Sequence, residues 1–101
     1  MPSFRAQLEI LALHPGQRPE AVMDTAVAVL GSLHLVEANQ LDIAAGIPRI
    51  TLRFLVDPAD WEAESRQATR AALSMRHAVT EVADVGRLRI LRRRRGRWEP
   101  V

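Results

Sequence analysis

Two stretches of the chain alternate apolar and polar residues with a period of two, which is the pattern of a β-strand that buries one face. The stretches are residues 4–12 and 49–56. A strand with one buried face must be covered by another layer, so the pattern predicts a sheet that is covered on one side. The positions predicted to point inward are Phe4, Ala6, Leu8 and Ile10 in the first stretch and Ile50, Leu52, Phe54 and Val56 in the second.

Two other stretches carry apolar residues at helical spacing. The first begins at Pro19, whose missing N–H costs nothing at the first helical position, and it ends near Gly31. The second follows an acidic segment that contains a proline. In this segment we predict that Asp57 is the N-cap, Pro58 the first helical residue and Asp60 the third.

The remaining segments complete the order of elements. The further predicted strands are residues 34–45, 78–85 and 87–92, with a turn at residues 46–48 and a break at Gly86. The order strand, helix, strand, strand, helix, strand resembles ferredoxin-like folds, in which two helices cover one face of an antiparallel sheet. We therefore expect an α+β, ferredoxin-like βαββαβ domain over residues 1–86 and a C-terminal arginine-rich β-hairpin over residues 87–101.

The charge of the chain is divided unevenly along its length. All 14 basic residues are arginine, and the 12 acidic residues leave a net charge of +2. Residues 1–84 hold 7 arginines and 11 acidic residues, whereas residues 85–101 hold 7 arginines and 1 acidic residue. The body is thus acidic and the C-terminal end is basic. Arginine without lysine, together with abundant alanine, suggests a bacterial genome of high GC content.

The C-terminal segment RLRILRRRRGRWEPV has a structural and a functional interpretation. The structural one is a β-hairpin with a three-residue loop, Arg94-Arg95-Gly96, whose arginines discourage other strands from pairing with an exposed edge. The functional one is a basic ribbon that binds phosphate through arginine forks, with a tryptophan to stack on a base. A third interpretation is contact with the acidic face of a second subunit. The residues of the nucleic-acid site would be Arg87, Arg89, Arg92, Arg93, Arg94, Arg95, Arg97 and Trp98.

Residues suited to catalysis or metal binding are few. His14, His34 and His77 lie in separate segments, and none has a second histidine or a cysteine four residues away. The chain has no cysteine and no nucleophile or phosphate-loop motif. Asp57 and Asp60 are explained by helix capping. We therefore expect no catalytic residue, no metal and no cofactor.

A Pro-Gly loop follows the first predicted strand and precedes the first helix. In this loop, His14-Pro15-Gly16, and in its order of elements, the chain resembles the ACT-type small-molecule-binding domain over roughly residues 4–85. Domains of that family receive an amino acid at this loop, in an interface between subunits. The resemblance implies a ligand site at His14, Pro15, Gly16 and Gln17 and a homo-oligomeric protein.

Three leucines give a separate argument for self-association. Leu11, Leu13 and Leu55 are out of phase with the inward residues of their strands, and apolar side chains on an open sheet face indicate a partner surface. The alternative is that they are strand-end residues without a partner. The function we expect first is a non-enzymatic small-molecule-binding or regulatory module that acts as a homo-oligomer. A nucleic-acid-associated protein is the alternative, and an enzyme that uses His14 is the third hypothesis.

The sequence also bears on location. No apolar run approaches the roughly 20 residues of a membrane-spanning helix. The N-terminus has no basic start followed by an apolar run, which a secretory signal peptide would need. We therefore expect a cytoplasmic protein without a membrane partner.

Overall fold

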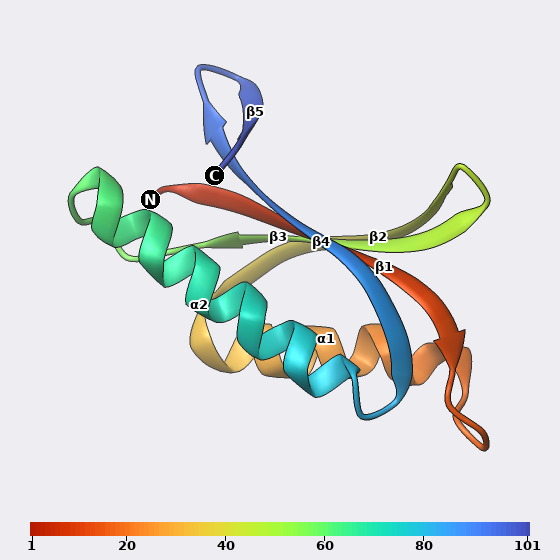
Figure 1. Cartoon of the computed structure of the whole chain (residues 1–101). Helices are drawn as coiled ribbons and strands as arrows, with labels where there is room; N and C mark the ends of the chain where they lie inside the picture. The colour runs from red at the N-terminus through yellow and green to blue at the C-terminus, as the bar shows by residue number, and fades with distance from the viewer.

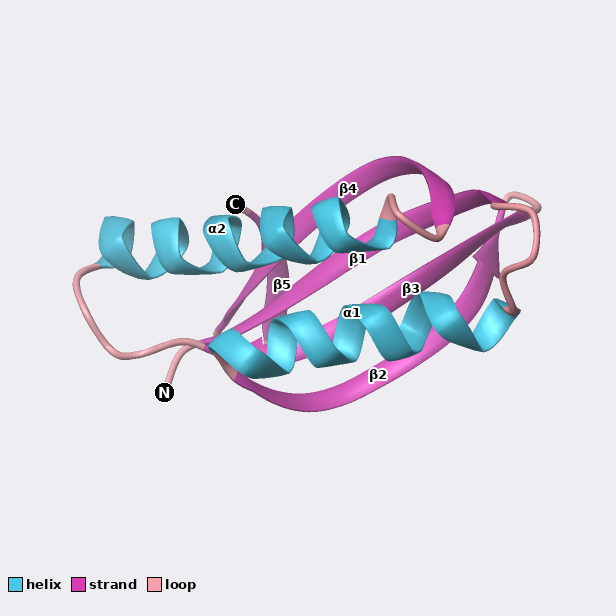
Figure 2. Ribbon diagram, turned by 90° about the horizontal axis from the view of Figure 1, so that it is seen from below, coloured by secondary structure: helices cyan, strands magenta, loops and turns pink.

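The chain folds into an antiparallel five-stranded sheet with two helices on one of its faces (Figures 1 and 2). The computed structural model describes all 101 residues. The spatial order of the strands is β2-β3-β1-β4-β5. The predicted α+β chain with two helices and an antiparallel sheet is confirmed. The elements in chain order are β1 (Ser3–Leu13), α1 (Pro19–Leu33), β2 (Leu35–Ala44), β3 (Ile47–Leu55), α2 (Trp61–Val79), β4 (Ala83–Arg94) and β5 (Arg97–Pro100).

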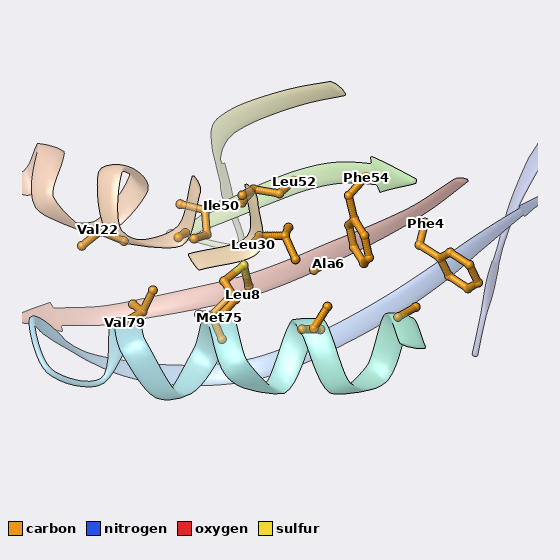
Figure 3. Close-up of a cluster of buried hydrophobic side chains, with 14 of the residues drawn as sticks. Phe4, Ala6, Leu8, Val22, Leu30, Ile50, Leu52, Phe54, Met75 and Val79 are labelled. Atoms are coloured by element: carbon orange, nitrogen blue, oxygen red, sulfur yellow. The ribbon is translucent and has the colours of Figure 1, made fainter. Parts of the chain in front are cut away.

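The hydrophobic core lies between the sheet and the two helices, and Figure 3 shows its labelled side chains gathered there. All eight inward positions predicted from the alternating stretches are buried. Phe4 and Phe54 lie opposite each other on β1 and β3, and their ring centroids are 6.2 Å apart. Half of the buried helix side chains are alanines, which let the helices approach the sheet closely; the full set is Val22, Ala26, Leu30, Ala68, Ala71, Ala72, Met75 and Val79.

The start of α2 differs from the prediction, because Asp60 and not Asp57 is the N-cap. The side chain of Asp60 accepts a hydrogen bond from the backbone N–H of Ala63 at 2.8 Å. The backbone N–H and carbonyl of Asp57 are both held by the side chain of Gln67, at 3.1 and 3.0 Å. Either aspartate could have capped a helix, and these contacts with the helix decide which one does.

The end of α2 also differs, since the first part of the predicted strand at residues 78–85 is helix and turn, and only residues 83–85 belong to a strand. The helix continues to Val79, which is fully buried and lies four residues after Met75 on the buried side of the helix. Strand β4 begins at Ala83 and runs without a break to Arg94. The predicted separation into two strands at Gly86 is therefore wrong.

Gly86 instead marks an irregularity within β4. The register between β1 and β4 shifts between Leu8 and Ile10, opposite this glycine. The backbone N–H of Arg87 donates to the Glu9 carboxylate at 2.8 Å. A Cβ atom at Gly86 would lie 2.8 Å from the same carboxylate and 3.2 Å from the Cβ of Glu9. A side chain at this position would crowd Glu9 and Leu11 of β1, so glycine fits the close approach of β1 to the backbone here.

Both hairpin turns have two residues, not three. The turn between β2 and β3 is Ala45-Gly46, with φ of 52° and 81°, and the turn between β4 and β5 is Arg95-Gly96, with φ of 51° and 77°. Two consecutive positive φ values define the type I′ turn, whose twist matches that of the flanking strands. The turn predicted at residues 46–48 therefore lies one residue earlier, at Ala45 and Gly46. The loop predicted at residues 94–96 has two residues, because Arg94 belongs to β4.

Replacing Ala45 with asparagine is expected to raise the free energy of unfolding by about 1 kcal/mol, because alanine is strained at positive φ and asparagine tolerates it. Urea denaturation measures the change. The same substitution at Ala38, an exposed extended position of β2, is the control and is expected to bring no gain. Equal effects at the two alanines would contradict the turn assignment.

Neither helix combines the length and the apolar composition that a membrane-crossing helix requires.

Candidate functional site: the arginine face of the sheet

The face of the sheet opposite the helices is lined mainly by arginines. It is built by the outward-pointing residues of the strands that supply the core, because successive side chains of a strand point to opposite faces. In the register of the central strands, Arg5 lies opposite Arg53, Gln7 opposite Thr51 and Arg89, and Glu9 opposite Arg49. We call this surface the arginine face and define it by Arg5, Arg49, Arg53, Arg87, Arg89 and Arg93.

Two of these arginines are neutralised by carboxylates of the edge strand. Arg49 donates to both carboxylate oxygens of Asp42, each at 3.2 Å, and Arg53 lies 3.3 Å from Glu37. The other four have no carboxylate oxygen within 4.0 Å; they are Arg5, Arg87, Arg89 and Arg93. The arginine face therefore presents four guanidinium groups that form no ion pair within the chain.

The floor of the arginine face contains two polar atoms without hydrogen-bond partners. They are Oε1 of Gln7 and Oγ1 of Thr51, which belong to an opposed pair on β1 and β3. Thr51 is only 7 % exposed. Buried polar atoms are paired in the great majority of cases, so such an unpaired couple is unusual. Of these two buried atoms, only the Thr51 hydroxyl can donate a hydrogen bond to an anion, because the amide oxygen of Gln7 is an acceptor.

Two small hollows flank this unpaired couple. One, of about 110 Å³, is lined by Gln7, Glu9, Arg49, Arg87 and Arg89. The other, of about 90 Å³, is lined by Arg5, Ala38, Asn39, Gln40, Thr51 and Arg53. Each hollow thus brings two or three guanidinium groups together around a concave, polar surface.

Trp98 closes one end of the arginine face. It lies on β5, in the hairpin that rises on the side of the sheet away from the helices (Figure 1). The guanidinium carbon of Arg5 lies 4.1 Å from its ring centroid, and that of Arg53 lies 5.5 Å away. Such cation–π contacts hold the arginine side chains in place. The N–H groups of Arg5 stay free to donate, whereas Arg53 already donates to Ser3 and lies beside Glu37.

The C-terminal arginines that the sequence singled out do not act as one group. Arg87, Arg89 and Arg93 belong to the arginine face, whereas Arg92 points to the helix side and is buried against Glu64 and Trp61. Arg94 lies 3.9 Å from Glu99, and Arg95 and Arg97 are exposed at the hairpin turn. A ligand on the sheet can therefore meet only part of the run.

Three residues of the arginine face were missed by the sequence-based prediction. Arg5, Arg49 and Arg53 lie far from the C-terminal run, and the sheet register brings them beside it. The signal that could have found them was the alternation itself, which placed Arg5 and Arg53 on the outward face of their strands.

The Pro-Gly loop is tied to the start of β4. The two ring nitrogens of His14 lie 3.2 Å from the carbonyl oxygen of Glu81 and 3.0 Å from the Asp84 carboxylate. An apolar pocket of about 230 Å³ lies beside the loop, although none of His14, Pro15, Gly16 and Gln17 lines it. The pocket is formed by Ile10, Leu13, Pro19, Val22, Met23, Leu41, Pro48 and Ile50.

The ion pair between Arg49 and Asp42 has a consequence that can be measured. The hydrogen bond from Arg49 holds the pKa of the Asp42 carboxyl below its ordinary value of 3.8. A depressed folded-state pKa means that the carboxylate supports folding at neutral pH and loses that contribution as the pH falls through the lowered pKa. The Arg49→Gln variant is expected to raise the pKa of Asp42, as measured by NMR titration of its side-chain carbon. An unchanged titration would contradict the pairing.

No protein-family model, no curated protein and no solved structure matches the chain. No group of three or more histidine, aspartate or glutamate side chains gathers where it could hold a metal ion. The guanidinium groups of the arginine face are of the kind that bind anions.

Proposed function

We propose that the chain is a non-enzymatic binding module with a ferredoxin-like fold, and that its arginine face holds the phosphate backbone of a single-stranded nucleic acid. The strand order β4-β1-β3-β2 with two helices on one face supports the fold assignment, and β5 is an addition at the edge of β4. The observation that carries the function is the set of four guanidinium groups without an ion-pair partner on the helix-free face of the sheet.

Phosphate is the ligand that best fits this surface. The planar arginine fork matches two phosphate oxygens, and the bonds are strengthened by charge. Arg87, Arg89 and Arg93 follow one strand over six residue-to-residue steps, which is about 20 Å at the rise of a β-strand. A row of this length suits a chain of phosphates better than one small anion. A basic row with an aromatic ring at its end is also how proteins hold single strands without reading their sequence.

The test of this function is a salt titration of binding to a mixed-sequence single-stranded oligonucleotide. If each of the four unpaired arginines meets one phosphate, the logarithm of the association constant should fall with the logarithm of salt concentration with a slope of about −3. Fluorescence anisotropy of a labelled oligonucleotide measures it. No binding at low salt, or a slope near zero, would rule the function out.

A small-molecule module remains a second candidate because of the apolar pocket beside the Pro-Gly loop. The resemblance to ACT-type domains suggests an amino acid as its ligand, and the lining suggests an apolar side chain. Met23 lines the pocket and Met75 lies in the core, so their methyl signals form a matched pair. Apolar amino acids should shift the NMR signal of Met23 and leave that of Met75 in place. Equal shifts at both, or none, would remove this candidate.

A further inference from the structure

The two edges of the sheet are protected very differently. At one edge, β5 has only four residues, including two charged ones and Pro100. Short strands, charges and proline are the usual means of preventing an edge from pairing with another strand. At the other edge, β2 has ten residues, LVEANQLDIA, without proline. Its two charged residues, Glu37 and Asp42, form ion pairs with arginines of β3, and its one register irregularity lies between Val36 and Ala38. Its outward backbone groups are thus available to a further strand.

The side chains of β2 also suggest a covering partner. Leu35, Leu41 and Ile43 are 65 %, 66 % and 71 % exposed. Leu41 is on the helix side of the sheet, where it lines the apolar pocket beside α1, and Ile43, two residues further along the strand, shares that side. An unpaired edge flanked by exposed aliphatic side chains is the arrangement expected of a contact surface.

We propose that β2 pairs with β2 of a second copy of the chain, antiparallel and centred on Leu41, so that two sheets become one. A two-fold axis through this residue places Leu41 opposite the partner's Leu41. It keeps both pairs of helices on the same side of the joined sheet, because residues that face each other in an antiparallel pair share a face.

The sequence of β2 is complementary to itself in this register. Gln40 lies opposite the partner's Asp42, so an amide meets a carboxylate on both sides of the axis. Ala38 lies opposite the partner's Ala44. Centring the pair on Asp42 would instead bring two carboxylates together, which is destabilising. Asn39 lies opposite the partner's Ile43, so the match is not complete, but the pairs at Leu41, Gln40 and Ala38 favour a second copy of the chain as the partner.

The dimer would also bring two arginine faces onto one side of a ten-stranded sheet. The proposal itself does not depend on nucleic-acid binding, since it rests on the edge strand and its apolar side chains. Its test therefore uses the protein alone. The expected result is a mass in solution twice that of the chain, measured by sedimentation equilibrium of the full chain over a range of concentrations.

The register is tested by disulfide cross-linking. Because the chain has no native cysteine, only the introduced cysteines can form a disulfide. Opposed residues in an antiparallel pair have Cα atoms about 4.5–5.5 Å apart, within the range of a disulfide. The Leu41→Cys variant should therefore oxidise to a covalent dimer. The Asn39→Cys variant is the control: its two thiols would lie four residues apart along the strand, roughly 13 Å, and should not join.

A charged residue placed on the two-fold axis of the proposed dimer provides a third test, in which the mass in solution is measured. The Leu41→Lys variant sets two like charges opposite each other and should reduce the mass to that of one chain, with the circular dichroism spectrum unchanged. Leu73→Lys, at an exposed leucine of α2, should leave the dimer intact. A single-chain mass for the unaltered protein, or cross-linking at Asn39→Cys and not at Leu41→Cys, would overturn the proposal. So would a dimer that survives Leu41→Lys.

Discussion

Replacing Arg92 with alanine is expected to lower the free energy of unfolding by about 3–5 kcal/mol, because it leaves a buried carboxylate without its partner. The side chains of Arg92 and Glu64 are 5 % and 12 % exposed, and they form an ion pair. The same guanidinium donates to the carbonyl oxygen of Trp61 at 3.2 Å and lies 3.5 Å from the centroid of its ring. Arg92 thus fastens β4 to the first turn of α2.

Urea denaturation of matched variants measures this effect. Arg93 is the neighbouring arginine, exposed on the other face of the sheet, and Arg93→Ala should change stability by no more than about 0.5 kcal/mol. The Arg92→Lys variant should fall between the two, since lysine keeps the charge but loses the planar fork that stacks on the ring. Similar stabilities for Arg92→Ala and Arg93→Ala would show that the buried pair does not hold the fold together.

The position of Arg92 shows how far the alternation in the sequence could be taken. Leu88 and Ile90 pack against the core, and a period of two places Arg92 on the same side of β4. The sequence therefore contained the signal that separates this arginine from Arg93, although the run of four arginines conceals it. The alternation likewise predicted the core of β1 and β3.

Other features could not be read from the sequence, because contacts between distant segments decide them. The DPAD segment offers two capping aspartates, and the hydrogen bonds between Asp57 and Gln67 determine that Asp60 caps the helix. Gly86 was read as a strand break, yet the Glu9 carboxylate of β1 bridges to Arg87 and keeps β4 continuous. The arginine face also depends on sheet register, which brings β1 and β3 beside the C-terminal strand.

If the arginine face binds phosphates, as proposed, removing two of its arginines should markedly weaken nucleic-acid binding. Replacing both Arg87 and Arg89 with glutamine is expected to weaken binding to a single-stranded oligonucleotide by about 25-fold at 0.1 M salt. Each lost phosphate contact lowers the slope of the salt dependence by about 0.7, and this difference acts over the tenfold range between 0.1 and 1 M. The slope should therefore become shallower by about 1.4. Both arginines line the 110 Å³ hollow and neither has a carboxylate partner.

The matched control is the double variant Arg66→Gln and Arg70→Gln. These arginines are exposed on α2, on the helix side of the sheet, so the control makes the same change in net charge away from the arginine face (Figure 2). If the protein attracted nucleic acid only through its overall charge, the two double variants would bind alike. A loss confined to Arg87 and Arg89 would instead locate the phosphates on the sheet, because only there do guanidinium groups from three strands converge on one surface.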